Sequence, residues 1–321
     1  PGSDNSLSKN KSIVIDGIVP SISSINEGSL NTDLDYQNNQ TDLTLSWAQA
    51  VDAFFDTMYY DYSLGITKGG KEIIEWTSSN GELKVQLSGL TLIENVTYYS
   101  SVKATDGAGN ISPILQGDGI TIDKTAPLTN SINDGIGEDV DISTSNKTIS
   151  ANWLQFNDAT SYVVKYEYTV GTVASGNDVK DWTDIGVYTS FIDSSFTLNH
   201  AQIYFVSVKA TDAAGNVSKV STSDGVTIDL YPGPPSVEAI SVSEGTYLPL
   251  TDDVPMTIDF SEAISNYTIS FSSQLKNSVN FNESKDGNRI TINIQAPLTS
   301  LDTLSLLIEN VTDLVGNVSD K

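Results

Sequence analysis

Apolar and polar residues alternate with a period of two through most of this chain, and that is the periodicity of β-strands. Segments 43–47 and 149–153 each place three apolar residues at alternate positions and end in tryptophan. Segments 254–260, 267–271 and 290–294 continue the alternation toward the C-terminus. Successive side chains of a strand point to opposite faces, so each segment predicts a strand with one buried and one solvated face. No segment shows the 3.6-residue period of an amphipathic helix.

The clearest alternation lies in segment 98–105, which has a copy in segment 204–211. The pattern predicts that Tyr98, Val102 and Ala104 face the core, that Ser101, Lys103 and Thr105 face solvent, and that Tyr204, Val206, Val208 and Ala210 face a second core.

This copy belongs to a longer internal repeat. Segment 101–110 recurs as segment 207–216, an offset of 106 positions. The same offset relates Trp47 to Trp153, Tyr62 to Tyr168, Gly65 to Gly171, Trp76 to Trp182, Tyr98 to Tyr204 and Asp118 to Asp224. A third copy of the Thr-Asp-x-x-Gly-Asn turn occupies 312–317. A repeat of this length indicates whole domains in tandem.

Prolines divide the repeats, because each follows an alternating run and cannot continue a central strand. They predict domains at 20–125, 126–231 and 232–321. The segment 1–19 is interpreted as a cloning scar, from its opening Pro-Gly-Ser, and a linker strand from a preceding repeat. Short strands separated by Gly, Asn and Asp turns predict an all-β chain of three tandem antiparallel β-sandwiches. Joined end to end, these would form an elongated array on the order of 100 Å long.

The first two repeats resemble the fibronectin type III-like and bacterial immunoglobulin-like repeats of large cell-surface proteins. The resemblance lies in the early strand tryptophans, a Tyr-rich strand that enters a Gly-Thr turn, a Trp-Thr pair and the Ser-Val-Lys-Ala-Thr-Asp strand. Repeat two matches more closely at Gly171-Thr172, where repeat one has Gly65-Ile66. Segment 260–264 and the last turn resemble another bacterial immunoglobulin-like family, found in surface-layer and adhesin proteins.

The resemblance implies a non-catalytic stalk, spacer or adhesion segment on a bacterial cell surface. Modules of this type also accompany secreted polysaccharide-degrading enzymes, so a carbohydrate-binding or accessory module is the alternative. We expect a monomer whose partners are neighbouring repeats and a surface glycan or a host or cell-surface protein.

The charge balance narrows the range of partners. The chain has 41 acidic and 16 basic residues, a net charge of −25, and no cysteine. This charge disfavours nucleic acid and anionic membrane surfaces and favours cations. No apolar run reaches the ~20 residues that cross a bilayer.

Eight oxygen-bearing residues lie near the proline-marked linkers, and we interpret them as candidate Ca²⁺ ligands at domain junctions, since calcium prefers six to eight hard oxygens. They are Asp106, Asn110, Asp118, Asp123, Asp212, Asn216, Asp224 and Asp229. The Thr-Asp-x-x-Gly-Asn motif by itself favours a purely structural turn over a cation site, because Asp accepts hydrogen bonds from nearby amides and Gly-Asn tolerates positive φ.

Catalysis has little support in the sequence. His200 is the only histidine, and repeat one has Glu94 in its place, so a Ser-His-Asp site would depend on one unrepeated loop residue. Composition alone leaves a paired-carboxylate glycosidase open. The alternating tryptophans are predicted to be core residues, whereas the carbohydrate-binding alternative requires an exposed aromatic cluster, expected around Tyr247 and Tyr267.

Overall fold

The computed structural model describes residues 15–30, 32–55, 57–242, 254–273, 280–295 and 304–319, and in these ranges it contains strands and no helix. Domain 1 consists of β1 (Ile25–Glu27), β2 (Tyr36–Gln37), β3 (Leu43–Trp47), β4 (Tyr59–Gly65), β5 (Ile74–Ser78), β6 (Lys84–Leu87), β7 (Thr97–Thr105), β8 (Leu115–Gln116) and β9 (Ile120–Ile122). Domain 2 consists of β10 (Ile132–Asp134), β11 (Ile142–Ser143), β12 (Ile149–Trp153), β13 (Val163–Gly171), β14 (Lys180–Asp184), β15 (Ser190–Asp193), β16 (Ile203–Asp212), β17 (Ser221–Thr222) and β18 (Val226–Ile228). Domain 3 consists of β19 (Val237–Ile240), β20 (Val254–Phe260), β21 (Ile264–Ser273), β22 (Phe281–Asp286), β23 (Arg289–Ile294) and β24 (Leu304–Asp313).

Domains 1 and 2 share one topology. In domain 1 the sheet β1-β3-β6 faces the sheet β2-β9-β7-β4-β5, to which β8 adds by pairing with β7. In domain 2 the sheets are β10-β12-β15 and β11-β18-β16-β13-β14, with β17 on β16. The chain crosses from one sheet to the other directly after β1 and β10, and the short strands β2 and β11 then pair in parallel with β9 and β18. Domain 3 pairs β19-β20-β23-β22 in one sheet and β21-β24 in the other.

The three cores are separate hydrophobic clusters, and alternation along the strands fills them. Leu43, Leu45 and Trp47 in domain 1 and Ile149, Ala151 and Trp153 in domain 2 are all buried, as are Ile290, Ile292 and Ile294 in domain 3. The predicted inward positions of β7 and β16 are also buried. Aromatic rings pack across the two sheets, with Trp47 stacked on Tyr62 and Trp153 edge-on to Tyr166.

One prediction for β7 is wrong. Ser101, expected to face solvent, is fully buried. Two neighbours surround Ser101. Gln116 of β8 pairs with it in the sheet, and Ser63, its partner on β4, donates a hydrogen bond to the carbonyl of Gly70 in the adjoining loop. Ser207, its repeat, is buried in the same way and shares a 2.9 Å hydrogen bond with Thr222 of β17.

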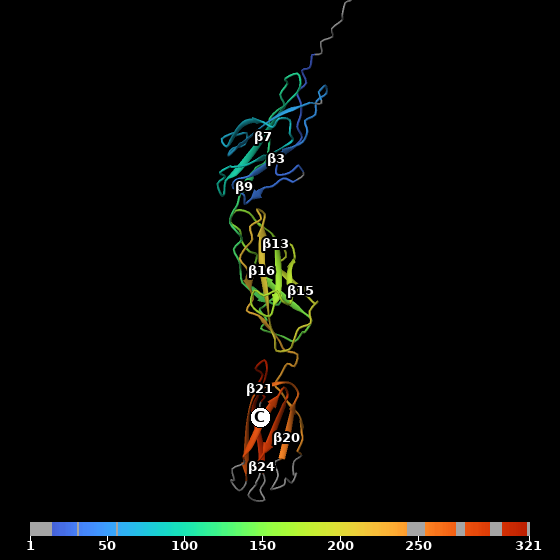
Figure 1. Cartoon of the computed structure of the whole chain (residues 1–321), viewed down its shortest axis with the longest axis vertical. Coiled ribbons are helices and arrows are strands. Elements are labelled where there is room, and N and C mark those ends of the chain that lie inside the picture. The colour runs from blue at the N-terminus through green and yellow to red at the C-terminus, as the bar shows by residue number, and fades with distance from the viewer. Residues whose placement is uncertain are drawn as a thin grey trace, which may run out of the picture.

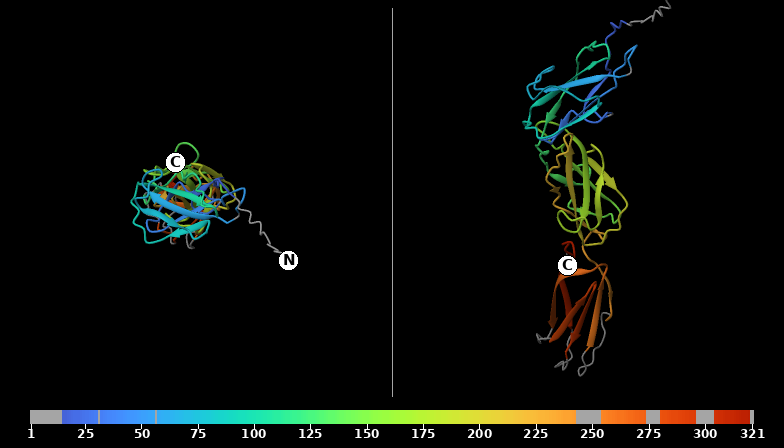
Figure 2. Two further views of the ribbon diagram at one scale, coloured as in Figure 1. Left: turned by 90° about the horizontal axis from the view of Figure 1, so that it is seen from above. Right: turned by 45° about the horizontal axis from the view of Figure 1, so that its top comes forward.

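The three sandwiches follow one another along the long axis of the molecule (Figure 1). The same sequence of domains is visible when the molecule is tilted, and viewed from above the domains overlie one another (Figure 2). Domains 1 and 2 contact each other through side chains at their junction. The rings of Tyr36 and Tyr162 meet edge to face at 5.9 Å, and the Thr160 hydroxyl donates to the Asn95 side chain. The last described residues return to the end of domain 3 that faces domain 2, where Asn317 donates to Asp229.

Candidate cation sites at the domain junctions

The repeated Thr-Asp-x-x-Gly-Asn turn fixes one aspartate at the junction end of each domain. Asp106 Oδ1 accepts from the backbone N–H groups of Ala108 and Asn110 at 2.9 and 2.8 Å, and Gly109 supplies a φ of 93°. Asp212 and Asp313 accept from the N–H groups of Asn216 and Asn317, both at 2.8 Å. All three aspartates are buried. The structural role proposed for this turn is therefore real, and it also immobilises a carboxylate.

The turn asparagines act as hydrogen-bond donors. Asn110 Nδ2 donates to Asp106 Oδ2 at 2.9 Å and to the Asp16 carbonyl at 3.4 Å. Asn216 Nδ2 donates to Asp212 Oδ2 and to the Asp123 carbonyl, each at 2.9 Å. These predicted ligands thus hold the linker against the turn. Burial alone would raise the pKa of Asp106, but hydrogen bonds from Asn110, Ala108 and Gly109 outweigh it and lower that pKa.

Between domains 1 and 2, three aspartates converge from different segments. Asp123 follows β9, Asp158 follows β12, and Asp212 ends β16; one carboxylate oxygen from each lies within 4.8 Å of the other two. Asp123 Oδ1 accepts from Thr125 N–H at 2.9 Å, and Asp158 Oδ1 accepts from Ser161 N–H at 2.8 Å. The second oxygens of Asp123 and Asp158 are buried and have no hydrogen-bond partner. Burial and the nearby Asp158 and Asp212 charges raise the pKa of Asp123, despite hydrogen bonds that lower it.

The same arrangement recurs where the N-terminal linker meets domain 1. Asp16, Asp52 and Asp106 place one oxygen each within 4.8 Å of the others. Asp16 Oδ1 accepts from Ile18 N–H at 2.9 Å and Asp52 Oδ1 accepts from Phe54 N–H at 2.8 Å. Their second oxygens are again buried without a partner. We call these two sets, and the one between domains 2 and 3, the junction clusters.

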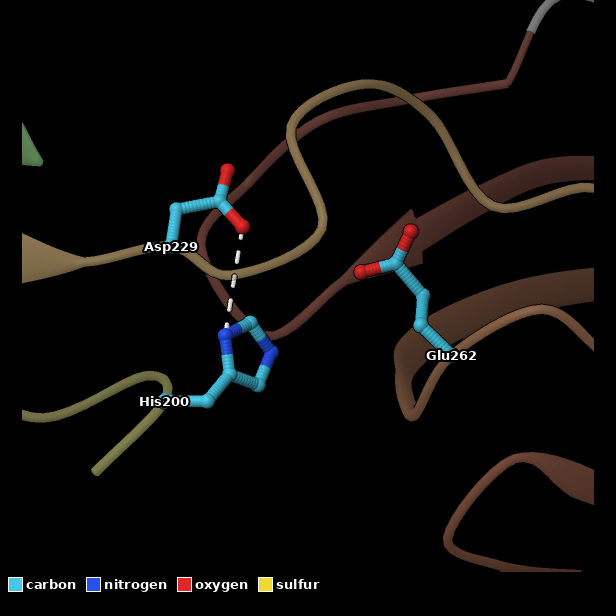
Figure 3. Close-up of side chains that lie close together, drawn as sticks. All are labelled: His200, Asp229 and Glu262. Carbon is cyan, nitrogen blue, oxygen red and sulfur yellow. Dashed lines mark ion pairs between the residues drawn. The ribbon is translucent and has the colours of Figure 1, made fainter. Parts of the chain in front are cut away.

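The third junction cluster consists of one aspartate, one glutamate and one histidine. His200, Asp229 and Glu262 place one ligand atom each within 4.8 Å of the others and point toward one another from three segments (Figure 3). His200 Nδ1 accepts from Leu230 N–H at 3.2 Å and lies 3.9 Å from Asp229 Oδ1. Glu262 Oε2 is buried without a partner. Burial, together with the charges of Asp313 and Asp229, raises the pKa of Glu262 to about 7.

Residue by residue, the eight predicted ligands divide into three groups. Asp106, Asp123, Asp212 and Asp229 lie in junction clusters, and Asn110 and Asn216 support them through hydrogen bonds. Asp118 and Asp224 lie in a separate pair of acidic clusters inside domains 1 and 2.

Sequence reasoning missed other members of the junction clusters, namely Asp16, Asp52, Asp158, His200 and Glu262. A signal for two of them was present, because Asp52 and Asp158 are related by the repeat offset of 106 positions.

The chemistry of the junction clusters suits a hard divalent cation. Each brings at least two carboxylates together with buried, unpartnered oxygens, and a buried uncompensated charge is costly unless it is protonated or neutralised. Among the described residues, no lysine or arginine forms an ion pair with these acids. Carboxylate oxygens are the ligands that Ca²⁺ prefers.

The core prediction for the tryptophans holds for Trp47 and Trp153 and is wrong for Trp76 and Trp182, which the core clusters do not include. Trp47 and Trp153 are buried, whereas Trp76 and Trp182 are partly exposed beneath the ammonium groups of Lys103 and Lys209, at 4.7 and 4.2 Å from the ring centres. Tyr267 packs against the domain 3 core, and Tyr247 lies outside the described residues. No helix in the described part of the chain has the length and apolar character needed to cross a membrane.

The strand order and the paired sheets place this chain in the class of tandem β-sandwiches of the immunoglobulin-like and fibronectin type III-like kind. No family model matches the sequence, and no curated protein matches it. Among solved structures, the FN1-FN3 domains of chicken CNTN1 are similar at 14% identity, covering 93% of this chain and 93% of that chain with a TM-score of 0.23. The chicken interferon gamma receptor alpha chain is similar at 13% identity, covering 66% of this chain and 100% of that chain with a TM-score of 0.28.

Proposed function

We propose that this chain is a non-catalytic spacer of a bacterial cell-surface protein, in which divalent cations at the junctions limit bending between domains. The observation that carries the proposal is the repetition of one arrangement at successive junctions. At the first two junctions the residue that ends the linker or domain meets two aspartates of the next domain. At the third, Asp229 meets Glu262 of domain 3 and His200 of its own domain. Every set includes a buried carboxylate oxygen without a partner.

A cation at such a cluster would join two bodies. Between domains 1 and 2 the direct contacts include an aromatic pair and hydrogen bonds from Thr160 and Asn216, and a metal–carboxylate bond would add to them. Ca²⁺ bound by Asp123, Asp158 and Asp212 would bridge the linker and domain 2 directly. The negative charge of the chain would keep neighbouring spacers soluble and apart.

Small-angle scattering of the whole chain, in millimolar Ca²⁺ and then in chelator, tests the proposal. We expect a longer and stiffer particle with Ca²⁺. In a variant that combines Asp123→Asn and Asp212→Asn, the scattering profiles in Ca²⁺ and in chelator should differ less than those of the unaltered chain. The reason is that the cluster between domains 1 and 2 has lost two carboxylates. Glu82→Gln is the matched control, since Glu82 is exposed and lies outside every cluster. Identical profiles of the unaltered chain in both buffers would contradict cation bracing.

A further inference from the structure

We propose that domains 1 and 2 each hold a second divalent cation, inside the domain, at the sites formed by Glu27, Asp33 and Asp118 and by Asp134, Asp139 and Asp224. In each set one carboxylate oxygen per residue lies within 4.8 Å of the others. We call these sets the crossover clusters. They share no residue with the junction clusters, so the proposal does not depend on cations at the junctions.

The crossover clusters lie where the chain passes between the two sheets. Glu27 ends β1 in one sheet, Asp33 lies on the segment that leads to β2 in the other, and Asp118 lies between β8 and β9 of that second sheet. The Glu27 N–H donates to Asp33 Oδ1 at 2.9 Å, and in domain 2 the Asp134 N–H donates to Asp139 Oδ1 at 2.7 Å. A cation here would tie the sheet crossover to the opposite sheet.

The first acid of each cluster is a buried carboxylate with one satisfied and one unsatisfied oxygen. Glu27 is 0% exposed, and its Oε1 accepts from the backbone N–H and the hydroxyl of Ser100 at 3.0 and 2.6 Å. Asp134 is 1% exposed, and its Oδ2 accepts from Gly225 N–H at 3.0 Å. Glu27 Oε2 and Asp134 Oδ1 have no hydrogen-bond partner, although each is buried beside two further acids. A bound cation accounts for oxygens placed in this way.

The two repeats build the same cluster with different supporting residues. Glu27 pairs with Leu45 and Asp134 pairs with Ala151 at equivalent places in their sheets, so the two acids correspond despite their different lengths. The donor Ser100 corresponds to Val206, which has no hydroxyl.

On the opposite side, Gly117 corresponds to Ser223. A Cβ at Gly117 would lie 2.1 Å from Glu27 Oε1, whereas the Ser223 side chain accompanies the shorter Asp134 carboxylate and lowers its pKa. Repeat one therefore combines a glutamate with the hydroxyl of Ser100, and repeat two combines a shorter aspartate with the hydroxyl of Ser223. Both repeats nevertheless contain all three carboxylates. A merely structural buried acid would not require its two acidic neighbours to be retained.

Electrostatics agree with this geometry. Burial raises the pKa of Glu27, with smaller contributions from Asp33 and Asp118, and hydrogen bonds from Ser100 oppose the increase. Burial also raises the pKa of Asp134 to about 6, with Asp139 and Asp224 adding to the effect.

Equilibrium dialysis of the whole chain against Ca²⁺ at pH 7.5 counts the bound ions. We expect a variant with both Asp118→Asn and Asp224→Asn to bind about two ions fewer than the unaltered chain. Both residues are exposed, so this variant should keep its fold. Glu138→Gln removes an exposed acid from the same loop as Asp139 and should leave the count unchanged. An equal count in the double variant would overturn the proposal.

Glu27→Gln tests the site by a second measurement. The glutamine carbonyl can still accept from Ser100, while its amide group replaces the unpartnered Oε2 and can donate to Asp33 or Asp118. In chelator we expect domain 1 of this variant to unfold at a temperature equal to or above that of the unaltered chain. Ca²⁺ should raise that temperature by less than in the unaltered chain, because only the junction cluster of Asp16, Asp52 and Asp106 remains on this domain. A variant that still gains thermal stability from Ca²⁺ to the full extent would overturn the assignment of Glu27.

The failure of this proposal can be told apart from the failure of cation bracing. Crossover variants should change the ion count without changing the scattering profile, whereas Asp123→Asn with Asp212→Asn should change both. A crossover variant that alters particle length but not ion count would count against the intradomain site while leaving the junction sites in place.

Discussion

Asp193 and its counterpart Leu87 show how equivalent residues can serve two copies of one fold in different ways. In domain 2, Asp193 forms a 2.6 Å ion pair with Lys180 and accepts a 2.7 Å hydrogen bond from the Tyr168 hydroxyl. In domain 1 the equivalent of Lys180 is Ile74, and Leu87 and Ile74 are both part of the core packing. The same inter-sheet gap is therefore filled by a polar group in one repeat and an apolar group in the other.

We predict that Asp193→Asn destabilises domain 2 by about 2 kcal/mol at pH 7, because it leaves the Lys180 ammonium without its counter-charge. Burial alone would raise the pKa of Asp193, but bonds from Lys180, Ser195 and Tyr168 outweigh it and hold that pKa far below its usual range. A depressed pKa contributes stability above the pKa of the unfolded chain, near 4, and that contribution is lost as pH falls through the folded-state value. The measurement is urea unfolding of both proteins from pH 7 to pH 3. A difference in unfolding free energy that stays constant at low pH would contradict the assignment.

At the scale of elements, hairpins that bring two backbones into contact explain some of the repeated glycines. Gly171, at the end of β13, approaches Gly176 so closely that a Cβ would lie 2.5 Å from the Gly176 carbonyl carbon. Gly65 meets Gly70 in the same way, with the carbonyl carbon at 2.4 Å. The repeated Gly65 and Gly171 therefore reflect close backbone approach in the β4–β5 and β13–β14 hairpins.

We expect Gly171→Ala to cost domain 2 on the order of 2 kcal/mol or more, because the backbone of the hairpin must shift to admit the methyl group. Gly137→Ala is the matched control in the same domain. No atom lies within 4 Å of its added Cβ, and its φ is not positive, so its effect should stay within about 0.5 kcal/mol. Thermal unfolding of both variants, measured by scanning calorimetry beside the unaltered chain, separates the two. Equal melting temperatures would show that the hairpin yields more easily than its geometry indicates.

At the scale of the whole molecule, the three sandwiches follow one another along one axis, although each has its own core (Figure 1). Their hydrophobic clusters do not merge, so each domain supplies its own folding free energy. Orientation depends instead on small contacts at the junctions, of which the Tyr36–Tyr162 pair is an aromatic example. An edge-to-face pair contributes about 0.5–1.5 kcal/mol, too little to hold one orientation alone.

We predict that a variant with both Tyr36→Ala and Tyr162→Ala broadens the range of orientations between domains 1 and 2 in chelator and that Ca²⁺ restores most of the order. Residual dipolar couplings measured domain by domain provide the comparison. The junction between domains 2 and 3 is the internal control and should not respond. Unchanged alignment in chelator would show that other contacts set the orientation.

The local pattern of apolar and polar residues was sufficient to predict strands of this protein. Alternation identified β3, β12 and β23 with their buried faces, because strand periodicity is written into consecutive residues. The repeat offset likewise matched the first two domains position by position, since equivalent residues keep a constant spacing along the chain. Ser101 escaped this reasoning, because its burial depends on β8 and on the loop at Gly70, which are distant in the chain.

Only the tertiary structure shows which acidic residues form each cluster. Glu27 and Asp118 are far apart in sequence and meet only because β1 and the β8–β9 loop lie against each other across the sandwich. Asp123 and Asp229 could be recognised as linker residues, but their partners Asp158 and Glu262 belong to the following domains. Periodicity reports which face a residue takes, whereas a ligand set depends on which faces and loops the topology brings together.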